Sequence, residues 1–268
     1  MSLMPIKIAR DDFSKLDQMN AKKMVLLLGH GSRDAEGQAQ FFRLANLVQQ
    51  QMGSVKVQAA FLELCDPLVP EGIHTCVKMG AEKILAVPVF LSDASHVKED
   101  LPVALNEART QYPHVSIVYG RPLGMGKLVQ QVLLERLWET LTPEALRPMA
   151  LLLVGRGSPD PSATQELQKV ALAFKEQVQC HSMAVGFVDR AKPSVPETLE
   201  ACRASGAKGI LILPCLFFPG IVLNRIRHAV QEFKLLHPDC PLITAPCLGV
   251  HSKLADLVVT RIHQCESV

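Results

Sequence analysis

The sequence has little of what marks membrane, secreted or nucleic-acid-binding proteins. No apolar run reaches the roughly 20 residues that a bilayer-spanning helix needs, and the N-terminal segment lacks the apolar core of a signal peptide. With one Trp, two Tyr and a formal net charge of +2, the chain offers no basic or aromatic surface for nucleic acid. We therefore expect a cytoplasmic protein that binds neither nucleic acid nor membrane.

Paired cysteine motifs are also missing. The chain has eight cysteines, but none stands in C-x-x-C spacing, so the sequence carries no zinc or iron–sulfur motif. We expect reduced cysteines that pack as small apolar side chains.

An internal repeat is the strongest positive signal. Displaced by 126 residues, the sequence matches itself without a gap. VLLLGHGSRD (Val25–Asp34) matches LLLVGRGSPD (Leu151–Asp160), and DPLVPE (Asp66–Glu71) matches KPSVPE (Lys192–Glu197). A solenoid repeat spans only about 20 to 50 residues, so this period indicates two duplicated domains.

Each half alternates short Val/Ile/Leu-rich runs with longer amphipathic stretches. The order βαβαβαβα predicts a parallel sheet covered on both faces, and thus two tandem α/β domains. We predict an N-terminal extension at 1–23, a first α/β domain at 24–126, a linking helix at 127–148 and a duplicated domain at 149–268.

Three potential metal ligands directly follow predicted strands of the first half: His30, Glu63 and His96, evenly spaced by 33 residues. Ligands of parallel α/β sheets bind at the carboxyl ends of the strands. Two imidazoles and a carboxylate suit Co²⁺, Fe²⁺, Ni²⁺ or Zn²⁺, and three protein ligands leave positions open, as a catalytic site requires. The second half carries Arg156, Asp189 and Val222 at the corresponding positions.

The stretch Gly29–Ser32, G-H-G-S, has other readings. A glycine-flanked loop before a helix can cradle phosphate, but the spacing fits neither a dinucleotide fingerprint nor a P-loop. A G-x-S-x-G nucleophile elbow is absent, which argues against a serine hydrolase. The glycines instead favour close approach of a flat ligand to the backbone.

Three stretches, LLLGHGSRD, AFLELCDPLVPEGI and VPVFLSDASHVKEDLP, resemble the sirohydrochlorin chelatases, the class II tetrapyrrole chelatases. The two-half length is similar to the long, two-domain form. The resemblance implies two α/β domains that face each other across a cleft. It implies an enzyme that inserts Co²⁺ into sirohydrochlorin for cobalamin synthesis, or Fe²⁺ for sirohaem synthesis.

The resemblance also assigns residues. His30 and His96 match metal-binding histidines, with His30 as proton acceptor, and Glu63 matches the carboxylate that completes the site. We expect no tightly bound cofactor; the metal is a substrate, Co²⁺ first, with Fe²⁺ or Ni²⁺ as alternatives. The candidate substrate-binding residues are Ser32, Arg33, Asp66, Leu91, Ser92, Asp93, Ala94, Ser95, His96 and Arg156.

The substrate, an acidic tetrapyrrole, needs cations around its carboxylate rim. Cations near predicted strand ends are Arg33, Lys98, Arg156, Arg190 and Arg225. We favour Arg156 because it replaces a histidine within a repeated frame and because guanidinium binds carboxylate bidentately. The hypothesis is that the first half performs the chemistry and the second half anchors the ring.

Two other functions fit the same residues. One is a different metal-dependent lyase or hydrolase that uses His30, Glu63 and His96. The other is a non-enzymatic carrier of metal or tetrapyrrole, although a storage site favours a complete ligand set.

Overall fold

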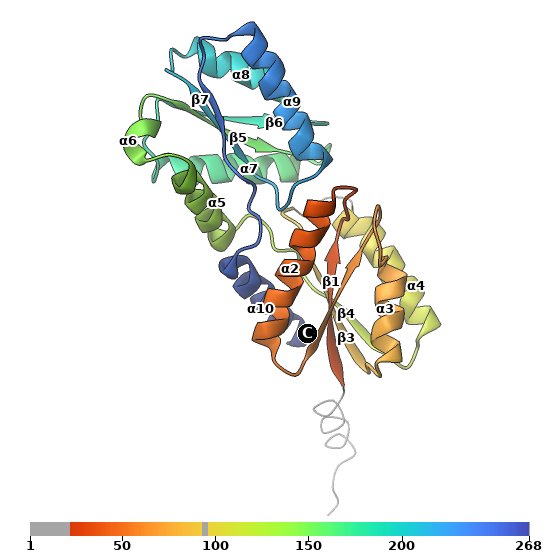
Figure 1. Ribbon diagram of the computed structural model, residues 1–268. Helices are drawn as coiled ribbons and strands as arrows, with labels where there is room; N and C mark the ends of the chain where they lie inside the picture. Colours follow the sequence, from red (N-terminus) through yellow and green to blue (C-terminus); the bar gives the residue numbers. More distant parts are fainter. Residues whose placement is uncertain (1–21, 93–95, 268) are drawn as a thin grey trace, which may run out of the picture.

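The computed structural model describes residues 22–92 and 96–267. These residues form two parallel four-stranded sheets, in the orders β2-β1-β3-β4 and β6-β5-β7-β8. Helices cover the sheets, and the two α/β units lie one above the other in Figure 1. The predicted fold class, two tandem parallel-sheet α/β units, is confirmed.

The first unit alternates strands and helices in the predicted order, and a short π-helical turn, η1, precedes its third long helix. Its elements are β1 (Lys23–Gly29), α2 (Ala35–Met52), β2 (Lys56–Phe61), α3 (Val69–Lys78), β3 (Lys83–Pro88), η1 (His96–Asp100), α4 (Leu101–Gln111) and β4 (Ser116–Tyr119).

The second unit repeats this order after a connection made of two helices. The connection is α5 (Lys127–Thr140) and α6 (Pro143–Leu146). The unit itself comprises β5 (Ala150–Gly155), α7 (Pro161–Lys175), β6 (Ser182–Phe187), α8 (Val195–Ala204), β7 (Ile210–Pro214), α9 (Ile221–Leu236), β8 (Leu242–Thr244) and α10 (Ser252–Glu266).

Strand β1 illustrates why these runs form central parallel strands. Residues from Met24 to Gly29 are all buried. Val25 and Leu27 belong to one hydrophobic cluster, whereas Leu26 and Leu28 belong to another on the opposite face. Since successive side chains of a strand point to opposite faces, a sheet covered on both sides needs an uninterrupted apolar run.

The repeat extends to unusual backbone geometry. Gly31 and Gly157 have φ angles of 96° and 87°, and Leu64 and Arg190, which also correspond, have φ angles of 72° and 49°. Positive φ is uncommon for residues other than glycine. The two halves therefore share one backbone frame around the turns that follow their first two strands.

The last helix crosses to the other unit. Although α10 ends the second repeat in sequence, it packs against α2 and β3 of the first unit. Lys23 pairs with Glu266 at 3.0 Å, and Arg261 donates to the carbonyl oxygens of Pro122 and Leu123 at 2.9 and 3.0 Å. In packing, α10 thus belongs to the first unit, which the predicted boundary of 149–268 does not anticipate.

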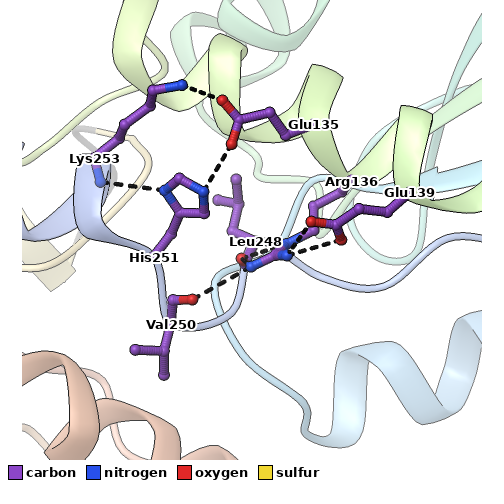
Figure 2. Close-up of polar contacts among 7 residues, drawn as sticks. All are labelled: Glu135, Arg136, Glu139, Leu248, Val250, His251 and Lys253. Carbon is purple, nitrogen blue, oxygen red and sulfur yellow. Dashed lines mark hydrogen bonds and ion pairs between the residues drawn. The ribbon is translucent and has the colours of Figure 1, made fainter.

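A polar cluster fixes the path to α10 (Figure 2). Glu135 of α5 pairs with His251 at 2.7 Å and with Lys253, while the His251 ring accepts from the Lys253 backbone N–H at 3.1 Å and caps α10. Arg136 donates to the carbonyl oxygen of Leu248 at 2.8 and 2.9 Å. Side chains of α5 therefore satisfy backbone and capping groups of the segment that leads into α10.

The cysteines pack as unpaired side chains, five of them buried and three partly buried. All eight cysteines are free thiols, and burial raises the pKa of Cys76 to about 12. Among the described residues, no helix is both long enough and apolar enough to span a membrane.

Candidate metal site at the ends of strands β1 and β2

The pairing of β1 with β2 continues past the ends of both strands. Leu62 N–H donates to the carbonyl oxygen of Gly29 at 2.9 Å, and Glu63 N–H donates to that of His30 at 3.0 Å. These bonds extend the register that pairs Gly29 with Phe61. As a result, His30 and Glu63 stand side by side at the carboxyl edge of the sheet, where α/β proteins bind ligands.

Gly31 makes this juxtaposition possible. Its φ angle is 96°, and a Cβ atom there would lie 1.7 Å from the carbonyl oxygen of Glu63. Any side chain at this position would push Glu63 away from His30, because real Cβ atoms never approach an oxygen so closely. The glycine of the G-H-G-S motif thus serves the approach of one protein segment to another.

The side chains of His30 and Glu63 form a histidine–carboxylate pair. His30 Nε2 lies 3.5 Å from Glu63 Oε1, and their side chains are 26% and 52% exposed. His30 Nδ1 lies 3.4 Å from the carbonyl oxygen of Gly31, which can only accept a hydrogen bond. A proton on Nδ1 leaves the Nε2 lone pair directed toward the carboxylate, the tautomer that binds a metal or accepts a proton there.

The third predicted ligand is placed by its backbone alone. His96 is the first residue of η1, but its side chain is not described, so ligation by His96 stays a prediction. Asp93, Ala94 and Ser95 lie outside the described residues, whereas Leu91 and Ser92 follow β3 and are partly buried. Within 22–92 and 96–267, no three His, Cys, Asp or Glu side chains gather into a metal site.

Ser32 has a structural task in the turn before α2. Its hydroxyl accepts from Asp34 N–H at 3.1 Å, and Asp34 in turn caps α2 by accepting from Gly37 N–H at 2.9 Å. Arg33 and Asp66 are exposed in the turns that follow β1 and β2. Substrate contacts by these three residues stay predictions.

Two neighbours of the pair, Phe90 and Cys65, carry no sequence pattern that marks them as part of a site. The Phe90 ring lies 6.5 Å from the His30 ring between centroids. Cys65 lies behind the Gly31–Ser32 turn, where burial raises its pKa and a backbone hydrogen bond from Ser32 lowers it less. Its thiol therefore keeps its proton near neutral pH.

The carboxyl ends of the two sheets face each other. A Cβ atom on Gly37 would lie 2.3 Å from the carbonyl oxygen of Pro219, and one on Gly220 would lie 3.1 Å from the Ser32 hydroxyl. Lys98 of η1 pairs with Asp160, which follows β5, at 3.1 Å. The turns that carry His30 and Arg156 thus border the same junction between the units.

The second unit has the same backbone hydrogen bond between the turns after its first two strands, but it has Arg156 in place of the histidine. Asp189 N–H donates to the carbonyl oxygen of Arg156 at 2.8 Å, as Glu63 N–H does to His30. The Arg156 side chain is exposed. Asp189 forms an ion pair with Arg225 at 2.8 Å.

Fold and site together define a class: a duplicated α/β protein whose facing strand ends carry a histidine–carboxylate pair on one side only. The CbiX family model matches residues 24–140 and 150–265. Because this match covers nearly the whole chain, the protein belongs to the CbiX family.

Relatives and solved structures agree with this assignment. The chain is 34% identical to the sirohydrochlorin cobaltochelatase of Priestia megaterium, over 90% of the chain and 79% of the relative. It is 32% identical to the sirohydrochlorin ferrochelatase of Priestia megaterium, over 92% and 91%. The structure of SirB from Bacillus subtilis with Fe³⁺ superposes with a TM-score of 0.78 at 28% identity, covering 92% of this chain and 96% of that one.

Proposed function

We propose that this protein is a sirohydrochlorin chelatase, which exchanges two pyrrole N–H protons of the ring for one divalent metal ion. The observation that carries the proposal is the His30–Glu63 pair, 3.5 Å apart at the facing strand ends. It stands in a chain that matches relatives named as sirohydrochlorin chelatases over nine-tenths of its length.

The pair provides both activities that metal insertion needs. His30 Nε2 and the Glu63 carboxylate hold the incoming ion, with His96 as the predicted third ligand, and an incomplete ligand set leaves positions for the pyrrole nitrogens. As the ion passes to the ring, two protons leave the pyrrole nitrogens. His30 and Glu63 accept them and pass them to water, so two positive charges enter the ring and two leave.

Exposure of the pair suits a metal that must be released. Half of the Glu63 side chain is in contact with solvent, so the carboxylate attracts M²⁺ without enclosing it in a dry cage. We favour Co²⁺ for cobalamin synthesis, with Fe²⁺ for sirohaem as the alternative. Relatives of similar identity carry the names cobaltochelatase and ferrochelatase. A cytoplasmic location stays a prediction.

Arg156 is proposed as an anchor for the carboxylate rim of the ring. It occupies the frame position of His30, is exposed, and borders the junction between the units. We expect Arg156→Ala to raise KM for sirohydrochlorin up to about fivefold, as loss of an exposed charge pair does, while kcat changes little. An unchanged KM would remove the anchor role.

The test is an anaerobic absorbance assay of sirohydrochlorin with Co²⁺ and, in parallel, Fe²⁺. His30→Ala and His96→Ala are each expected to abolish the acceleration over the protein-free reaction, because a ligand and proton acceptor is lost. The matched control is His114→Ala, an exposed histidine before β4 at the opposite edge of the sheet, which should retain wild-type rates.

The ratio of the wild-type rates identifies the preferred metal. If the wild type binds the ring tightly but accelerates insertion of neither ion, the chelatase proposal is wrong and a tetrapyrrole carrier takes its place. If His30→Ala keeps the full rate, the site is wrongly placed.

A further inference from the structure

Four corresponding positions around the candidate site differ in their summed charge between the two halves. At these four positions the first half carries two carboxylates and no Lys or Arg, whereas the second half carries three arginines and one carboxylate. In order along the repeat, the positions are His30, Glu63, Leu64 and Glu99 in the first half, and Arg156, Asp189, Arg190 and Arg225 in the second. The same backbone frame thus presents a net negative set on one side and a net positive set on the other.

Asp189 occupies the same position in the backbone of the second half that Glu63 occupies in the first. A Cβ atom on Gly157 would lie 1.8 Å from the carbonyl oxygen of Asp189, against 1.7 Å for Gly31 and Glu63. However, Arg225 Nη1 lies 2.8 Å from Asp189 Oδ2. The counterpart of a metal-site carboxylate is therefore neutralised by an arginine from the first turns of α9.

The positive set borders the junction with the first unit. Gly220, which precedes α9, abuts Ser32, and Asp160 of the turn after β5 pairs with Lys98. Arg156 and Arg190 belong to the turns after β5 and β6, and both side chains are exposed. Neither forms an ion pair with a residue in the described part of the chain.

We propose that the ion pair with Arg225 prevents Asp189 from binding a metal ion, and that Arg156, Arg190 and Arg225 together form a docking face for the carboxylates of the substrate. The inference rests on the proposed function and adds to it the roles of Arg190, Arg225 and Asp189. Guanidinium groups suit this task because they bind carboxylates in a planar, two-point geometry. Neutralising Asp189 matters because an unpaired acid in this face repels an anionic ring.

The first measurement is the Kd of sirohydrochlorin without metal, by absorbance titration of the full-length protein. Arg190→Ala and Arg225→Ala should each weaken binding by up to about fivefold, the range for partly exposed charge pairs. Adding Asp189→Asn to Arg225→Ala should recover part of the affinity, because it removes the acid that Arg225 neutralises but does not replace the docking cation. Higher salt should weaken wild-type binding and compress these differences.

Two controls separate docking from folding. Arg203→Ala removes an exposed arginine paired with Glu200 at 3.1 Å near the end of α8, and it should leave Kd unchanged. Arg225→Lys keeps the charge but loses the planar two-point geometry, so it should weaken binding less than Arg225→Ala does without restoring the wild-type Kd. The Kd for Co²⁺ alone should not change in any of these variants, since His30 and Glu63 lie in the other unit.

An unchanged Kd in both Arg190→Ala and Arg225→Ala overturns the proposal. So does a failure of Asp189→Asn to recover affinity in the Arg225→Ala background. Because ring binding is read without metal, these outcomes are distinct from failure of the proposed function, in which the wild type binds the ring and does not accelerate insertion.

Discussion

Gly31 and Gly157 have the same backbone geometry beside different chemistry. Each lies at positive φ, and in each case a carbonyl oxygen, of Glu63 or of Asp189, occupies the space of a side chain. The frame is therefore a structural requirement of both halves, whereas the neighbouring residue, His30 or Arg156, is free to differ. At the scale of single residues, chemistry and architecture are encoded at separate positions.

This separation predicts how two matched variants differ. Gly31→Ala and Gly157→Ala should each lower the free energy of unfolding by about 1–3 kcal/mol or more. Both variants place an alanine at positive φ with its Cβ atom against a carbonyl oxygen. Only Gly31→Ala should weaken Co²⁺ binding to the protein, since it displaces Glu63 from His30. Isothermal titration with Co²⁺ checks this, and equal loss of Co²⁺ affinity in both variants would contradict it.

At the scale of secondary-structure elements, a cluster of charged side chains connects helix α5 to helix α10. Glu135 accepts from Lys253 and His251, and the Lys253 hydrogen bond is the largest cause of its lowered pKa. Partial burial raises the pKa and only in part offsets this effect. A lowered pKa in the folded state means that the ionised carboxylate stabilises the fold, and that this stabilisation disappears as the pH falls through the folded pKa.

Glu135→Gln should therefore destabilise the protein near neutral pH and have no effect in acid. With more than a third of the Glu135 side chain exposed, we expect a loss of about 0.5–1 kcal/mol. The loss should shrink below the ordinary carboxyl pKa of 4.5 and vanish below the folded pKa. Urea unfolding across this range measures it, with exposed Glu144→Gln as control; a pH-independent loss would argue against the pair.

One hydrophobic cluster extends through the whole molecule. It contains Leu27 and Phe41 of the first unit, Leu151 and Leu153 of the second, and Leu254 of the crossing helix α10. Because a shared core and a crossing helix couple the two sheets, neither unit buries its apolar surface alone. The junction beside the candidate metal site is thus held by the core itself.

We expect the two units to unfold in one transition. Fluorescence of Trp138 in α5, the single tryptophan, and far-ultraviolet circular dichroism should report the same midpoint. Leu254→Ala, at a fully buried position, should cost about 2–5 kcal/mol and shift both signals together. Exposed Leu235→Ala should shift neither, and separate midpoints for the two signals would indicate independent units.

Local sequence determined the strands, the helices and the repeat. Apolar runs such as Val25–Leu28, bounded by turn residues, favour buried strands. Gly80, at a φ of 83°, follows the end of α3, where a glycine commonly terminates a helix. The repeat predicted two sheets of similar topology, because two segments with the same pattern of apolar and turn residues adopt the same fold. The alignment of His30 and Glu63 at one edge followed from parallel topology, in which carboxyl ends meet.

Tertiary packing decided what local sequence leaves open. The helix α10 follows the second repeat in sequence and buries one face, and its packing against α2 and β3 of the first unit is a contact between distant segments. The pairing of Arg225 with Asp189, 36 residues apart, depends on how α9 packs beside the turn after β6. The approach of Gly37 to Pro219 depends on how the two units meet. A sequence fixes periodicity and local propensity, whereas contacts between distant segments follow from the shapes that the segments form once folded.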